Sequence, residues 1–286
     1  MASLRELRKR LDSVRMTGQM AGAMKTAAAA GYARFNAVLT RFAPYAEACG
    51  AMRERFGGAL GEAYPVKDPS APPCFIVLGA DRGLSGGYNF NLYDYADAIL
   101  GEAGDFRLFV AGRHAAAHFR ERGIGLREFA LSTRYEDARA ILDEAAGLLR
   151  DGEISSVTVL WQRFVNMLTQ VPDRFGLLPM KSSGGGTDAS DALFLPDRDT
   201  VLREAAQACV GADFYARVLE AGAGSQAATL VTMRSAYDNA EVSTAELTAD
   251  ISRLRQSEVT SSVIETSGGN LRGRDGGSGR GGENHA

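Results

Sequence analysis

The N-terminal stretch 4–49, LRELRKRLDSVRMTGQMAGAMKTAAAAGYARFNAVLTRFAPYAEAC, decides the fold of this chain. Apolar or small side chains recur in it at alternating spacings of three and four residues, which is the heptad seam of a coiled-coil helix. The seam positions are Leu4, Leu7, Leu11, Val14, Gly18, Ala21, Lys25, Ala28, Tyr32, Phe35, Leu39, Phe42, Ala46 and Cys49. With a rise of about 1.5 Å per residue this helix would be roughly 75 Å long, which is more than a compact domain needs.

A second seam lies near the other end of the chain, at positions Leu230, Met233, Tyr237, Ala240, Thr244, Leu247, Ile251 and Leu254. After Leu254 the strict register would place Glu258 and Ser261 inside, so we expect the pairing to weaken there. Because both seams are long, we expect a long antiparallel coiled coil of the N- and C-terminal helices. Pro44 should kink the first helix or end its strictly regular part.

The sequence between the two seams predicts a separate, Rossmann-like α/β domain. Strand-like runs at 74–80, 106–112 and 155–164 alternate with helix-like runs at 88–103, 114–123 and 136–152, and 192–196 is a possible last strand. Alternation of this kind is typical of βαβ units with an at least partly parallel sheet, so the predicted fold class is α/β.

Prolines and glycines set the expected domain boundaries. The predicted organisation is an N-terminal coiled-coil helix over 1–60, a linker over 61–73, an α/β foot domain over 74–197, a C-terminal coiled-coil helix over 198–267 and a disordered glycine-rich tail over 268–286. Within the α/β domain, 180–191 is expected to be a flexible insertion.

The composition is that of a globular protein without a nucleic-acid signature. The 286 residues carry 32 basic and 35 acidic side chains, which gives a formal net charge of −3. Cys49, Cys74 and Cys209 are odd in number and far apart, which favours reduced thiols over disulfides or a zinc site. No run of about 18 apolar residues is present, so no membrane-spanning helix is predicted. The basic N-terminus resembles a transit peptide, but its amphipathic pattern continues beyond the point where a presequence would end.

The loop after the first strand contains Gly83-Leu84-Ser85-Gly86-Gly87, which fits the G-x-S-x-G pattern of a nucleophile elbow. An enzyme of that class needs a serine at the end of a strand and a later histidine. Here Asp81 and Arg82 intervene, and His114 and His118 come early for a catalytic triad. A serine hydrolase using Ser85 is therefore the weaker interpretation, and backbone geometry explains the glycines better.

Other sites are not indicated by the residues. Asn89 is a candidate cap for the helix that follows the loop. Neither a G-x-x-x-x-G-K-[ST] nor a G-x-G-x-x-G motif is present, and potential metal ligands are not clustered, so no cofactor or metal is predicted.

The first helix is strongly basic, and a solvated helix face is the ordinary explanation for such a run. Up to Arg41 it carries eight basic side chains and two acidic ones. The surplus favours an acidic partner, which leaves open a coiled-coil adaptor that binds nucleic acid, an acidic protein loop or a membrane-proximal surface.

A set of motifs resembles the gamma subunit of the F-type ATP synthase, over almost the whole chain. The stretch 1–25, with Ala23-Met24-Lys25, is similar to the N-terminal helix of that family, and 43–48 to its proline-tyrosine step. The stretch 81–92, DRGLSGGYNFNL, is similar to its D-[RK]-G-L-C-G-x-x-N loop, and 230–240 and 253–260 resemble its C-terminal helix. The combination in this order is specific, although no single motif is.

The resemblance implies the central rotor shaft of the F-type ATP synthase. In that family the terminal helices lie inside a hexamer of alternating alpha and beta subunits, and the α/β domain lies at the foot, against the epsilon subunit and the c-subunit ring. The chain would be a non-catalytic subunit without a cofactor, and it would couple ion-driven c-ring rotation to ATP synthesis or hydrolysis at beta. It would reach the membrane only through the complex, at the cytoplasmic face of the bacterial inner membrane or, alternatively, on the mitochondrial matrix side.

The resemblance also implies functional residues. Met24 and Lys25 would contact the acidic lever region of beta, and Arg255 and Gln256 the catch region of the hexamer. The foot-domain loop residues that match the family's motif are Asp81, Arg82, Gly83, Gly86, Gly87 and Asn89. Nucleic acid is not expected as a partner.

Overall fold

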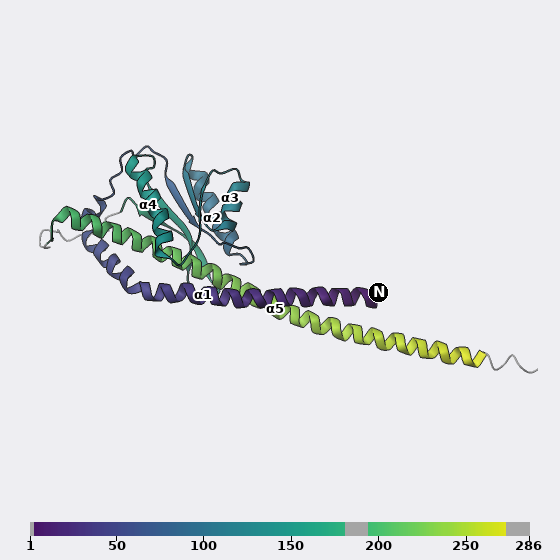
Figure 1. Ribbon diagram of the computed structural model, residues 1–286. Helices are drawn as coiled ribbons and strands as arrows, with labels where there is room; N and C mark the ends of the chain where they lie inside the picture. The colour runs from purple at the N-terminus through teal and green to yellow at the C-terminus, as the bar shows by residue number, and fades with distance from the viewer. Residues whose placement is uncertain (1–2, 181–193, 273–286) are drawn as a thin grey trace, which may run out of the picture. The chain divides into compact units, whose positions relative to one another are not determined.

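The computed structural model describes residues 3–180 and 194–272, and the predicted insertion at 180–191 lies almost wholly outside them (Figure 1). Two long helices begin and end this part of the chain, α1 (Leu4–Gly61) and α5 (Arg198–Arg272). Helix α5 reaches Arg272, inside the predicted tail, and the remainder of that tail is not among the described residues. The chain divides into two compact units, Met1–Gly22 with Ser235–Ala286, and Ala23–Arg234.

Pro44 does not end the first helix, since α1 continues through it to Gly61. Proline leaves the carbonyl of Thr40 without its helical partner, but Pro44 lies on the exposed side of α1, where water can solvate that carbonyl. The C-terminal part of α1 curves away from the direction of its earlier turns (Figure 1).

In the first unit, α1 and α5 pair in antiparallel directions, as predicted. A Cβ on Gly18 would lie 3.1 Å from the Ala240 Cβ, and one on Gly22 would lie 3.2 Å from the Tyr237 ring. All predicted seam positions of this unit are buried or half-buried. The predicted weakening is also confirmed, because every side chain over 255–264 is exposed.

The second unit contains a five-stranded sheet in the order β3-β2-β1-β4-β5. The strands are β1 (Cys74–Leu78), β2 (Arg107–Ala111), β3 (Arg127–Phe129), β4 (Val157–Phe164) and β5 (Gln170–Leu178). The pairings of β1 with β2 and β4, and of β2 with β3, are parallel, whereas β4 and β5 are antiparallel. The predicted α/β fold is therefore confirmed, but β3 and β5 were not foreseen. The described part of the expected strand at 192–196 is not a strand.

Three shorter helices complete this unit: α2 (Tyr88–Ala103), α3 (Arg113–Glu121) and α4 (Tyr135–Asp151). Helix α4 buries an apolar stripe at helical spacing, and it ends where Gly152 adopts a φ of 83° and donates its N–H to the Leu148 and Leu149 carbonyls. The side chains that make this stripe are Ala138, Ile141, Leu142, Ala145, Ala146 and Leu149.

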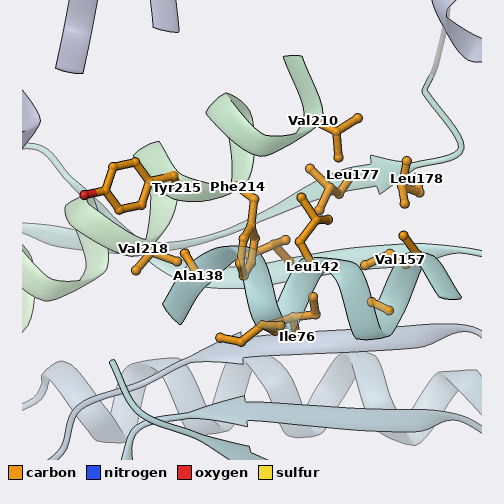
Figure 2. Packing of buried hydrophobic residues seen from close by; sticks show 14 of the residues in the cluster. Ile76, Ala138, Leu142, Val157, Leu177, Leu178, Val210, Phe214, Tyr215 and Val218 are labelled. Carbon is orange, nitrogen blue, oxygen red and sulfur yellow. The ribbon is translucent and has the colours of Figure 1, made fainter. Parts of the chain in front are cut away.

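Helices α2 and α3 cover one face of the sheet, and α4 with α1 and α5 covers the other. Figure 2 shows the core on the face covered by α1, α4 and α5, where side chains of α5 face those of α4 and of the strands. Those labelled are Val210, Phe214, Tyr215 and Val218 of α5, Ala138 and Leu142 of α4, and Ile76, Val157, Leu177 and Leu178 of the sheet. Helix α5 is therefore part of the domain core rather than an attachment to its surface.

The three cysteines carry free thiols, as predicted, and the structure shows that all three are buried. Burial raises the pKa of the Cys74 and Cys209 thiols to about 12. Among the described helices, none is both long and apolar enough to cross a membrane.

Candidate functional site

The carboxyl ends of parallel strands form the edge where α/β folds usually bind nucleotides. Here α5 occupies that edge. Ala80 after β1, Tyr88 at the start of α2 and Ala228 of α5 form a buried apolar cluster. The Tyr88 hydroxyl donates to the Ala221 carbonyl of α5 at 3.0 Å, and the Gln162 amide donates to the Tyr88 carbonyl at 2.7 Å. The crevice thus holds a helix of the same chain.

The predicted foot-domain loop, Asp81–Asn89, lies between this edge and α3. The Asp81 carboxylate accepts the backbone N–H of Arg113 at 3.2 Å, and the Asn89 amide donates to the Arg82 carbonyl at 3.1 Å. Asn89 therefore braces the loop. The prediction that Asn89 caps α2 is wrong, because Gly87 is the N-cap of this helix and no side chain forms a capping hydrogen bond there.

Two backbone positions explain part of the glycine pattern in the loop. Gly86 has a φ of 58°, and a Cβ there would lie 2.9 Å from the Thr232 hydroxyl of α5. Gly83 lies beside the His114 ring, where a Cβ would be 3.3 Å from Nε2. Leu84 has a φ of 66° although it carries a side chain. Close packing and a left-handed backbone thus account for glycine at Gly83 and Gly86.

The geometry does not support the serine hydrolase. Ser85 is only 3% exposed, and its hydroxyl has no hydrogen-bond partner among the described residues. His114, whose ring lies beside Gly83, forms a hydrogen bond between its Nδ1 and the Tyr93 hydroxyl at 2.8 Å. A nucleophile needs an adjacent base, and no side chain in the described part of the chain hydrogen-bonds to the Ser85 hydroxyl.

Met24, one of the predicted partner-contact residues, lies close to the loop. Met24 lines a cavity of about 270 Å³ together with Asp81, Arg82 and Arg113, and Lys25 follows it on α1, half-buried. Arg34 joins the same lining, so three guanidinium groups face one carboxylate. The structure therefore brings Met24 and the loop together on a basic surface.

Arg255 and Gln256 lie on α5 in the other unit. Both side chains are exposed, and the Gln256 carbonyl accepts the Thr260 hydroxyl at 2.8 Å. Exposure leaves both side chains accessible to a partner.

Sequence reasoning missed a polar network between α1, α5 and the sheet. Asp213 forms ion pairs with Arg53 and Arg217, and Glu220 accepts from the Trp161 indole at 2.9 Å. Burial raises the pKa of the Asp213 carboxyl against the opposing effect of the arginines, and it lowers the pKa of the Arg217 guanidinium. No motif marks these residues, since the contacts of Asp213 with Arg53 and of Glu220 with Trp161 join residues distant in sequence, and Asp213 with Arg217 alone is spaced like an ordinary helical ion pair.

The fold and this geometry define a class of protein in which two long terminal helices pair with each other and pack on one face of the sheet of an α/β domain. A family model described as ATP synthase matches residues 3–270. The chain is 32% identical to the ATP synthase gamma chain of Acidiphilium cryptum, covering 93% of this chain and 97% of the relative. It is 30% identical to that of Anaeromyxobacter dehalogenans, over 94% and 98%.

Solved structures agree in fold. A chain of the Euglena gracilis mitochondrial ATP synthase superposes with a TM-score of 0.67 at 15% identity, covering 99% of both chains. A chain of the Tetrahymena thermophila mitochondrial ATP synthase central stalk and c-ring gives a TM-score of 0.55 at 16% identity, covering 76% of this chain and 99% of that one. The protein belongs to the ATP synthase gamma-chain family. The predicted role as the central shaft of that complex is confirmed.

Proposed function

We propose that this chain transmits rotation between a c-subunit ring and the beta subunits of an alpha–beta hexamer, and that it performs no chemistry itself. The observation that carries the proposal is the continuity of α5, which lies in the core of the α/β domain and extends without interruption to Arg272. A continuous helix transmits torque, whereas a jointed one would absorb it.

The basic surface around Met24 suits an acidic partner. Met24, which lines a cavity with Arg34 and Arg82, and Lys25, the next residue on α1, are proposed to contact an acidic lever of beta, because opposite charges favour encounter and fix orientation. Arg255 and Gln256 are proposed to contact the catch region of the hexamer. The α/β domain would contact epsilon and the c-ring, on the cytoplasmic face of a bacterial membrane or on the matrix side in mitochondria.

Assembly is the first test. The full chain is co-expressed with alpha, beta and epsilon subunits from the same source, and the purified complex is assayed for ATP hydrolysis. We expect all four proteins to co-purify and hydrolyse ATP. A chain that stays alone in the presence of these partners contradicts the proposal.

The contact residues are tested in the same complex. Lys25→Ala should lower ATP-driven rotation, because it removes a cation from the surface that faces the acidic lever. Lys67→Ala is the matched control, since Lys67 is exposed in the segment after α1 and belongs to no proposed contact. Equal rotation rates for the two variants would contradict the proposal that Lys25 contacts beta.

A further inference from the structure

Four charged side chains lie where α1 and α5 meet β4 and β5, all within the unit Ala23–Arg234. Arg53 comes from α1, and Asp213, Arg217 and Glu220 come from successive turns of α5. The side chains of Arg53, Asp213 and Arg217 are only 26%, 21% and 17% exposed. Charged groups at this depth are uncommon unless they are paired.

Arg217 is held between the helices and the sheet. Its guanidinium carbon lies 3.5 Å from the centre of the Phe175 ring on β5 and 5.1 Å from the Trp161 ring on β4. Its Nη1 donates to the Asp213 carbonyl at 2.6 Å. A cation over an aromatic face and next to a carboxylate has a defined position, because both attractions depend on geometry.

The other members of the network complete the connection. The Arg53 guanidinium bonds to the Asp213 carboxylate and lies 5.6 Å from the Phe175 ring, so α1 joins the same group. Glu220 accepts from the Trp161 indole and, at 2.8 Å, from the backbone N–H of Phe164. Two helices and two strands are therefore connected through two positive and two negative charges.

Stability alone is a poor reason for such a network. Apolar side chains of similar volume often stabilise a core as well as or better than a buried ion pair, whereas breaking the pair is costly. A slide or twist of α5 against the sheet would separate Arg217 from Phe175 and Glu220 from Trp161. Apolar packing would tolerate such a slide, but directional bonds resist it.

We propose that Arg217 is a positioning residue for rotary coupling, and that its network prevents the α/β domain from turning relative to α1 and α5 under load. The proposal rests on the proposed function of the chain as a rotor. Without this network, ATP hydrolysis in the hexamer would still turn the helices, but part of the torque would be lost before it reached the c-ring.

The test uses the assembled, membrane-reconstituted complex with Arg217→Met, which keeps an unbranched apolar stem and removes the guanidinium group with its charge. We expect ATP-driven ion transport per ATP hydrolysed to fall, while the hydrolysis rate is retained. Arg217→Lys, which keeps the charge but loses the planar stacking, should restore part of the ratio. In the isolated full chain, where Trp161 is the only tryptophan, the emission spectrum reports whether the network has changed.

Arg163→Met is the matched control. Arg163 also pairs with an aspartate across β4 and β5, with Nε 3.1 Å from the Asp173 carboxylate, but the two side chains are 52% and 41% exposed. Exposed pairs contribute little, so this variant should keep the wild-type transport ratio.

Each outcome is decisive. An unchanged ratio in Arg217→Met overturns the inference, and so does an equal loss of hydrolysis and transport, which would indicate a merely structural role. If Arg217→Met fails to assemble, Glu220→Gln, which weakens the bonds to Trp161 and Phe164, should lower the same ratio, and an unchanged ratio there overturns the inference. Failure of the wild-type chain to assemble contradicts the proposed function instead.

Discussion

Substitution of Gly222 by alanine tests how tightly the two long helices must pack. Gly222 lies on α5 opposite Phe35 of α1, and both residues belong to the unit Ala23–Arg234. A Cβ at Gly222 would lie 2.1, 2.4 and 2.5 Å from three atoms of the Phe35 ring. The shortest separation has to grow to at least the 3.4 Å of an ordinary contact, so the ring or the helix must move by about 1.3 Å.

Two opposing effects set the expected magnitude. Overpacking of a well-packed contact costs about 1–3 kcal/mol. Replacing glycine by alanine inside a helix returns about 0.5–1 kcal/mol. The free energy of unfolding should therefore fall by about 0–2.5 kcal/mol, and each kcal/mol corresponds to roughly 2–4 °C in a protein of this size.

The assay is thermal and urea unfolding followed by circular dichroism. Gly147→Ala is the matched control, because Gly147 lies inside α4 where an added Cβ would meet nothing within 4 Å, and this variant should be stabilised. Phe35→Leu combined with Gly222→Ala should relieve the clash, so the two changes should be non-additive. Gly222→Ala as stable as Gly147→Ala would refute the close contact.

Three further predictions address the seam, the loop and the thiols. Leu247→Asp should lower the free energy of unfolding by more than about 2 kcal/mol and speed amide hydrogen exchange in the first unit, because the Leu247 side chain is only 8% exposed. Val263→Asp is the control and should leave the free energy of unfolding unchanged, because Val263 is 58% exposed. Ser85→Ala should leave stability unchanged or raise it by up to about 1 kcal/mol, because it removes a buried hydroxyl that has no hydrogen-bond partner among the described residues, and a serine-reactive probe should not label the wild type. The raised pKa of Cys74 and Cys209 lowers their thiolate fraction at pH 8 by roughly 10³-fold, so a disulfide reagent should react with them only after unfolding.

The terminal helices could be predicted because their signal is local and repeated. Each seam position adds to the same heptad pattern, so a single weak position such as Gly18 or Lys25 does not hide it. The same repetition explains why α1 continues through Pro44, which was predicted to kink the helix or end its strictly regular part. One unfavourable residue on an exposed face does not outweigh the packing of the turns on both sides.

The second half of the sheet could not be predicted in the same way. Strand β5 contains Pro172, Asp173 and Gly176, which all disfavour a strand. It forms because it is an edge strand that follows β4 through a short turn, and an edge position tolerates proline. Strand β5 is stabilised by its pairing with β4, and a local sequence pattern carries no information about that pairing.

The polar network was missed for a related reason. Asp213 and Arg217 are spaced like any surface ion pair on a helix. Only the fold places Phe175 and Trp161 over them and makes the pair half-buried, so its energetic role depends on contacts across the chain. The resemblance at Met24 and at the loop, by contrast, was visible because those residues form contiguous motifs.

The G-x-S-x-G loop illustrates why a motif needs its surroundings. A hydrolase needs the carboxyl edge of its sheet open to substrate, but here the Tyr88 hydroxyl bonds to α5 at that edge and the Ser85 hydroxyl is buried. A helix that fills the crevice is held by the sheet on one side and by α1 on the other. That arrangement resists rotation of the helix within the domain better than docking on an exposed face would. The edge that other α/β proteins use to bind a ligand therefore serves in this chain to fix α5 to the α/β domain.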